Sequence, residues 1–137
     1  MRLTRYTDFS LRVLIYLGVR PGRVCAISEI ARAYGVSHNH LMKVVHDLGK
    51  AGLVESERGR LGGVRLAKEP AAINIGALVR RTESDDLVEC GACVIAPACG
   101  LSSALDAALD AFLSVLDGYT LQDLIQKRRA LQTLLRA

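Results

Sequence analysis

A helix, a glycine turn, a second helix and a glycine-rich hairpin follow one another directly between residues 28 and 67. Helices are expected over 28–34 and 38–51, and the second has an apolar face formed by Leu41, Val44, Val45 and Leu48. Gly35 can supply the left-handed turn position between the helices, and Ser37 can cap the second one. Two β-prone runs, 53–57 and 64–67, flank a turn rich in glycine and arginine. With a further helix expected over 8–19 after a Thr7 cap, this order predicts a winged helix-turn-helix.

The rest of the chain is predicted to be helical apart from one loop. A short helix is expected over 75–81 after Pro70, and a loop spans 82–100. A 4-3-4-3 apolar spacing then predicts a long helix over 101–117 that pairs with a partner helix, its stripe being Leu101, Leu105, Ala108, Phe112 and Val115. A final short helix is expected over 121–126. We therefore expect a mainly α-helical protein with a small β-hairpin: a DNA-binding region (1–81), a cofactor loop (82–100), and a dimerisation helix with its tail (101–137).

Charge is divided unevenly along the chain. Residues 1–68 hold 12 Lys and Arg against 5 Asp and Glu, whereas residues 69–137 hold 6 against 9. A basic first half indicates a polyanion as its partner. The predicted double-stranded DNA contacts are short polar and cationic residues at the start of helix 38–51 and arginines at the wing tip, namely Ser37, His38, Asn39, His40, Lys43, Arg58 and Arg60. The alternative is that these side chains form only a solvated polar surface.

Other function classes are less favoured. His38, His40 and His46 could suggest a metal site, but His38 and His40 are two residues apart and do not share a helical face. The sequence has no apolar run near the ~20 residues that span a bilayer and no apolar stretch at its start, so we expect a cytoplasmic protein without a membrane partner. No Ser/His/Asp set, paired-carboxylate motif or phosphate-cradling loop is evident, so we do not expect an enzyme.

Three cysteines with the spacing C-x2-C-x5-C lie in the predicted loop: Cys90, Cys93 and Cys99. From the residues alone, an iron–sulfur cluster, a structural zinc site and a disulfide-forming thiol switch all remain open, with the cluster favoured. A fourth ligand could come from another chain or from nearby carboxylates, namely Glu83, Asp85, Asp86 and Glu89. Cys25 lies far away in sequence and is interpreted as a small, semi-buried apolar residue or a free thiol.

Several motifs together resemble one family of winged-helix iron–sulfur regulators, the family that contains NsrR, IscR and RirA. They are MRLT at the start, IARAYGVS over 30–37, LVES over 53–56, RGRLGG over 58–63, the three loop cysteines, and YTLQDL over 119–124. The resemblance covers nearly the whole chain. TDFSLR over 7–12 and VSHNHLMK over 36–43 are most similar to the NsrR branch. The gap between Cys90 and Cys93 is shorter than is usual in the family.

The resemblance implies a homodimeric, nitric-oxide-sensing repressor that binds a palindromic operator. It implies a four-iron four-sulfur cluster, or alternatively a two-iron one, held by Cys90, Cys93 and Cys99 with Asp8 of the other protomer as fourth ligand. Arg12, one helical turn on, would orient Asp8. Without the resemblance, Asp8 is better interpreted as an acid that complements the helix dipole. The alternative functions are a sensor of iron or iron–sulfur status in the same family and, from another class, an iron–sulfur cluster carrier.

Overall fold

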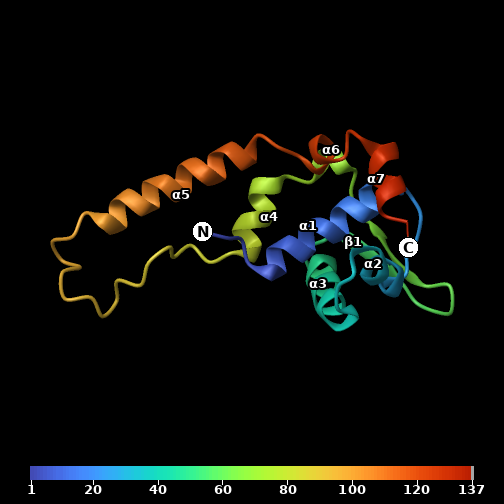
Figure 1. The fold of residues 1–137 in the computed structure, drawn as a ribbon, viewed down its shortest axis with the longest axis horizontal. Coiled ribbons are helices and arrows are strands. Elements are labelled where there is room, and N and C mark those ends of the chain that lie inside the picture. The colour runs from blue at the N-terminus through green and yellow to red at the C-terminus, as the bar shows by residue number, and fades with distance from the viewer. Residues whose placement is uncertain (137) are drawn as a thin grey trace.

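The computed structural model describes residues 1–136, and within them the fold is a mainly α-helical winged helix-turn-helix with one antiparallel hairpin (Figure 1). The elements are α1 (Arg5–Gly18), α2 (Ile27–Tyr34), α3 (His38–Lys50), β1 (Val54–Glu57), β2 (Gly63–Leu66), the 3-10 helix η1 (Pro70–Ala72), α4 (Ile75–Thr82), α5 (Leu101–Asp117), α6 (Leu121–Leu124) and α7 (Arg128–Leu134). The predicted fold class is confirmed. No helix in residues 1–136 is long and apolar enough to cross a membrane.

The winged helix-turn-helix of residues 1–81 is called the head below. Its core lies where α1 crosses the helix-turn-helix pair formed by α2 and α3. Val13, Leu14 and Leu17 of α1 are buried, and all four apolar residues predicted for the inner face of α3 are buried as well. Gly35 ends α2 with φ of 65°, a left-handed conformation that glycine adopts without steric cost. Its backbone N–H caps the carbonyls of the last turn, so α3 can begin three residues later.

Helix α1 begins earlier than predicted. Thr4, not Thr7, is the N-cap, and its side-chain oxygen accepts from the Thr7 amide. Thr7 is instead fully buried inside the first turn, where its hydroxyl donates to Thr82 Oγ1 at 2.7 Å. The prediction of Thr7 as the cap was wrong because both threonines precede the apolar stripe, and only the long-range contact with α4 distinguishes them. Asp8 consequently lies inside the first turn of the helix.

The hairpin is anchored to the head through Cys25. Strands β1 and β2 pair in the register Val54↔Leu66 to Glu57↔Gly63. The amides and carbonyls of Cys25 and Val64 exchange hydrogen bonds of 2.8 Å, and Cys25 is fully buried. Gly63 lies so close to the Cys25 backbone that a Cβ there would overlap it. Burial raises the pKa of the Cys25 thiol. Cys25 is both a small apolar core residue and a free thiol, in agreement with the two predicted interpretations, but it is fully and not partly buried.

Helix α5 spans the residues that the sequence predicts and extends away from the head (Figure 1). It packs against α4, and Leu113 is its one buried side chain in the described part of the chain. Arg80 of α4 forms a bidentate ion pair with Asp117 at the last turn of α5, and Gly76 gives that carboxylate room. Phe112, which the spacing assigned to a partner-facing stripe, packs partly on the core of its own chain. Leu113 was missed because it lies outside the 4-3-4-3 pattern.

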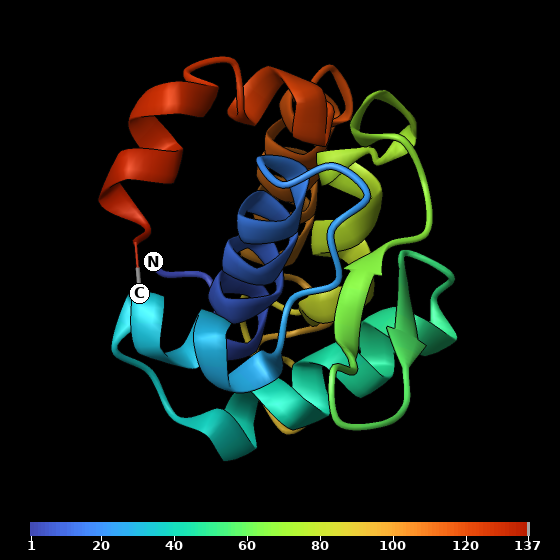
Figure 2. The ribbon, with the colours of Figure 1, turned by 90° about the vertical axis from the view of Figure 1, so that its right-hand side faces the viewer.

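The C-terminal segment returns to the head. Thr120 and Asp123 form a capping box at the start of α6. Gln132 Nε2 donates to the Val19 carbonyl at 2.6 Å, and the Arg20 guanidinium donates to the Leu135 carbonyl at 3.2 Å. These bonds hold α7 near the C-terminal end of α1 (Figure 2).

Candidate functional site

The start of α3 presents the predicted base-reading side chains to solvent. Ser37 caps the helix by accepting from the His40 amide, and its own side chain is exposed. In the next turns His38, Asn39, His40 and Lys43 are among the exposed residues. The buried face of the same helix fixes it on the head, so these polar groups point outward from a rigid element. All five residues predicted at the start of α3 are therefore accessible to solvent.

The hairpin lies beside α3, and its turn is at the same edge of the molecule (Figure 2). Arg58 and Arg60 are exposed in this turn, and among the described residues neither forms an ion pair. Arg65 on the return strand differs, because its guanidinium contacts Glu55 at 3.3 Å and Glu57 at 2.9 Å. The wing tip therefore has two cations without an ion-pair partner in the described part of the chain, and the return strand has one cation that is paired with two carboxylates.

Asp8 is engaged with its own helix. Its Oδ1 accepts from Arg12 Nε at 2.9 Å, which is the (i, i+4) pair predicted from the sequence. The side chains of both residues remain about two-fifths exposed, at 45% and 40%. Arg12 also lies over the ring of Tyr34 at 5.6 Å, and the Tyr34 hydroxyl donates to the Arg12 carbonyl at 2.8 Å. Arg12 therefore joins the Asp8 carboxylate to the last residue of α2.

The residues on either side of Asp8 contact α3. The Tyr6 hydroxyl donates to Asp47 Oδ2 at 2.5 Å, and the ring of Phe9 lies 5.9 Å from that of His40. Burial, and then the bond to Asp47, raise the pKa of Tyr6 to about 12. The same bond lowers the pKa of the Asp47 carboxyl, so the phenol stays protonated and the carboxylate stays ionised at neutral pH. Sequence reasoning missed both contacts, because nothing in the spacing of the residues relates Tyr6 to Asp47.

The cysteine loop projects beyond the first turn of α5 (Figure 1). Cys90, Cys93 and Cys99 are free thiols; Cys93 is exposed and the other two are half-buried. Cys90 and Cys93 line an open hollow of about 690 Å³, together with the carboxylate residues Asp86, Glu89 and Asp106. Cys99 Sγ accepts from the Leu101 amide at 3.4 Å, at the N-terminus of α5 as predicted. Hydrogen bonds from the Cys93 amide to Cys90 and from the Ala96 amide to Cys93 shape the loop.

A single chain does not assemble the predicted ligand set. Within residues 1–136, no three His, Cys, Asp or Glu side chains lie close enough together to hold a metal ion. The donor types nevertheless suit a soft-metal group, since three free cysteines share one short loop at the N-terminal end of α5. The residues that would hold such a group therefore remain a prediction.

Glu83 is committed to a different contact from the one the sequence suggested. Its Oε1 accepts from the Thr4 amide at 2.6 Å and from the Thr4 hydroxyl at 2.9 Å. Burial alone would raise the pKa of this carboxyl, but the neighbouring Thr7 hydroxyl and the Thr4 hydrogen bonds lower it. Glu83 follows the end of α4 and begins the segment that leads to the cysteines. It therefore ties the base of the cysteine loop to the N-cap of the helix that carries Asp8.

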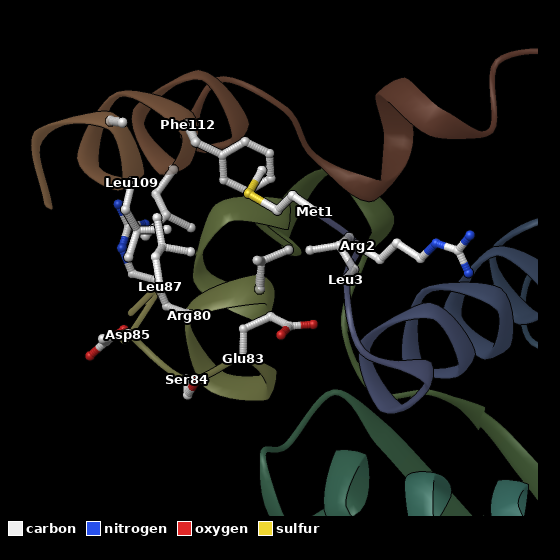
Figure 3. A pocket seen from close by; sticks show the side chains of 13 residues that line it. Met1, Arg2, Leu3, Arg80, Glu83, Ser84, Asp85, Leu87, Leu109 and Phe112 are labelled. Atoms are coloured by element: carbon white, nitrogen blue, oxygen red, sulfur yellow. The ribbon is translucent and has the colours of Figure 1, made fainter. Parts of the chain in front are cut away.

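An apolar cavity of about 300 Å³ lies between α4, α5 and the first residues of the chain. In Figure 3, Leu109 and Phe112 extend from α5 toward Met1 and Leu87. Arg80, Glu83 and Asp85 contribute polar groups to its lining. The cavity is thus next to the base of the cysteine loop and on the side of α4 that α5 covers.

Comparison with known proteins identifies one family. Residues 3–127 match the family model named Rrf2, described as an iron-dependent transcriptional regulator. The HTH-type transcriptional regulator NsrR of Bacillus subtilis (strain 168) is 52% identical over 143 residues, covering 99% of this chain and 98% of that protein. The protein of the same name from Geobacillus kaustophilus (strain HTA426) is 51% identical, covering 99% and 97%.

Solved structures agree with the sequence match. IscR of T. potens superposes with a TM-score of 0.76 and 26% identity, covering 93% of this chain and 88% of that one. CymR of B. subtilis, described as the global cysteine regulator, superposes with a TM-score of 0.73 and 29% identity, covering 90% and 95%.

Proposed function

The chain belongs to the Rrf2 family of transcriptional regulators, and on that premise we propose that it is a nitric-oxide-responsive repressor with an iron–sulfur cluster at its dimer interface. The observation that carries the proposal is the combination of two surfaces in one chain. One is a basic surface formed by α3 and the wing turn, and the other is a loop with three free thiols. The NsrR-named relatives, which match the chain over nearly its full length, support the choice of branch.

The DNA step is assigned to α3 and the wing. Asn39 can pair with an adenine edge, and His40 and Lys43 can reach guanine acceptors in the major groove. Arg58 and Arg60 are free to enter the adjacent minor groove, where the negative potential attracts arginine. Two copies of this surface in a homodimer would read a palindromic operator whose half-sites are about one helical turn, or a multiple of it, apart.

The homodimer is assigned to α5, whose outer face packs on no other element within residues 1–136. Leu101 and Val115 are 53% and 64% exposed, and Ala104, Ala108 and Ala111 between them are exposed as well. These five positions recur at 3-4-3-4 spacing along one side of the helix, which is the pattern of a helix that packs on another. The opposite side of α5 is occupied by α4.

The cluster would be held by Cys90, Cys93 and Cys99 of one protomer and by Asp8 of the other. Four iron atoms is the proposed content; a two-iron cluster is the alternative that iron and sulfide analysis would distinguish. When bound, the cluster supplies the iron atoms with which nitric oxide reacts. Arg12 holds the Asp8 carboxylate by its Nε–Oδ1 bond, and Glu83 holds the base of the loop near the start of the same helix.

Repression depends on the spacing of the two DNA-binding heads. While the loop of one protomer and the α1 helix of the other are joined, the two α3 helices are held at the distance that fits the operator. Release of Asp8 would free the heads from this constraint. A coupling free energy of about 2–3 kcal/mol between the two sites would change operator affinity roughly a hundredfold.

The test is a gel-shift titration of anaerobically prepared protein with and without a nitric oxide donor. We expect a loss of operator binding of about two orders of magnitude in the treated sample. Equal affinity in the two samples would reject nitric oxide as the signal.

A second candidate is a sensor of iron supply, which the description of the matching family as iron-dependent favours. Operator release by an iron chelator, with no response to nitric oxide, would select it.

A further inference from the structure

Two side chains near the start of α1 contact the DNA-reading helix, and Asp8 lies between them in sequence. Tyr6 bonds Asp47, and Phe9 packs on His40. His40 and Asp47 are seven residues apart, so they lie on one side of α3 at points about 10 Å from each other. Tyr6 and Phe9 therefore contact opposite halves of α3, in addition to the core packing between the two helices.

We propose that Tyr6 is the positioning residue that transmits the state of Asp8 to α3, through its hydrogen bond to Asp47. This inference rests on the proposed function, because it assumes that Asp8 is a ligand in the sensing state. A shift of the first turn of α1 that accompanies binding or release of Asp8 moves Tyr6 with it. Because the Tyr6 hydroxyl holds Asp47, the C-terminal half of α3 must follow.

The surroundings of the bond suit this role. Tyr6 is half-buried and packs against the core, so its ring has little freedom to follow Asp47 independently of α1. The groups around the pair are Lys43, His46 and Lys50 of α3 and Arg81 of α4, and all four are exposed. With these side chains solvated, the phenol–carboxylate bond is the direct polar link between the first turn of α1 and α3 in the described residues.

Other polar links from α1 run elsewhere. Thr4 and Thr7 bond Glu83 and Thr82 at the end of α4, and Arg12 contacts Tyr34 of α2. Tyr16, near the C-terminal end of α1, bonds Glu29 of α2 at 2.6 Å. Tyr16 therefore offers a matched control: a tyrosine on the same helix whose hydroxyl donates to a carboxylate of α2 instead of one on the DNA-reading helix.

The experiment compares Tyr6→Phe with Tyr16→Phe. Each change removes one hydroxyl and keeps the ring, and thermal unfolding checks that both proteins fold. For each protein, operator affinity is measured for the anaerobically purified cluster-loaded form and for the cluster-free form at one salt concentration. The measured quantity is the ratio of the two affinities. We expect Tyr6→Phe to reduce this ratio about fivefold, the factor for one hydrogen bond of ordinary net strength, and Tyr16→Phe to leave it unchanged.

Two further measurements test whether Tyr6 transmits the state of Asp8 to α3 or only stabilises the fold. Asp47→Asn keeps a side-chain oxygen that can accept from Tyr6, so its affinity ratio should equal that of the wild type. Asp47→Ala has no acceptor, so its affinity ratio should fall as it does in Tyr6→Phe. Hydrogen exchange should show that cluster loading protects the amides of 47–50 in the wild type but not in Tyr6→Phe. An unchanged ratio in Tyr6→Phe, or an equal loss in Tyr16→Phe, would overturn the inference while leaving the proposed function intact. A wild-type ratio of one would instead contradict the proposed function itself.

Discussion

The two kinds of arginine in the wing should behave differently on DNA. Arg58 and Arg60 at the tip form no ion pair among the described residues, whereas Arg65 is held by Glu55 and Glu57 across the hairpin. All three carry the same charge, so replacing any one of them with alanine changes the net charge of the wing equally. Of these three arginines, the two at the tip have no carboxylate to leave before they replace counterions on the DNA backbone, as far as residues 1–136 show.

The magnitude follows from counterion release. Each phosphate contact contributes about 0.9 to the slope of log affinity against log salt, and a dimer loses the contact twice, so Arg60→Ala should lower the slope by roughly 1.8. Over a fourfold rise in salt, the variant should therefore lose roughly 12-fold less operator affinity than the wild type does. Arg65→Ala should change the slope by less than half as much, because its guanidinium is already paired.

The assay is operator binding by fluorescence anisotropy over a salt series, for Arg58→Ala, Arg60→Ala and Arg65→Ala. If Arg65→Ala lowers the slope as much as the tip variants do, the ion pairs do not persist on DNA and the assignment of the tip is wrong. If none of the three changes the slope, the wing does not contact phosphates.

Three further predictions test the rest of the molecule. Leu113→Ala should lower the free energy of unfolding by about 2–5 kcal/mol in urea titrations. Ser114→Ala, at the exposed neighbouring position, should change it by less than about 0.5 kcal/mol. Similar values for the two variants would show that Leu113 does not anchor α5. The lowered pKa of Glu83 contributes stability that is present above the ordinary pKa of about 4.3 and is lost as pH falls through the lowered value. Glu83→Gln should remove this part of the acid destabilisation. If the free energy of unfolding of Glu83→Gln depended on pH as it does in the wild type, the Thr4 contact would be contradicted. Cys93→Ser should give colourless protein under anaerobic purification, whereas Cys25→Ala should keep its colour; retention of colour in Cys93→Ser would exclude Cys93 as a ligand.

Local sequence signals predicted most of the elements because each is bounded by residues with strong conformational preferences. Gly100 and Gly118 flank α5, and its predicted and observed spans agree. Gly35 and Ser37 likewise set the end of α2 and the start of α3. Where two candidates stood close together, as with Thr4 and Thr7, the choice depended on Thr82, a partner 75 residues away.

The sequence predicts which residues of the candidate site are exposed, but it does not predict the contacts between them. The exposed positions of α3 and the wing tip follow from helical periodicity and hairpin geometry, and the thiol loop follows from cysteine spacing. The contacts that join these parts are single hydrogen bonds between distant segments, such as Glu83 with Thr4 and Tyr6 with Asp47. Such pairs do not follow any periodic pattern in the sequence, and the proposed approach of Asp8 to the cysteines of another protomer would not follow one either.

We propose that a homodimer couples a bound iron–sulfur group to its affinity for operator DNA. The most direct measurement is operator affinity as a function of bound iron and sulfide, taken on anaerobic samples with graded cluster content from one preparation. The claim predicts that affinity rises in step with cluster content and falls to the cluster-free value when the cluster is removed. Preparations that contain no inorganic sulfide and yet bind the operator as tightly as any other would contradict it.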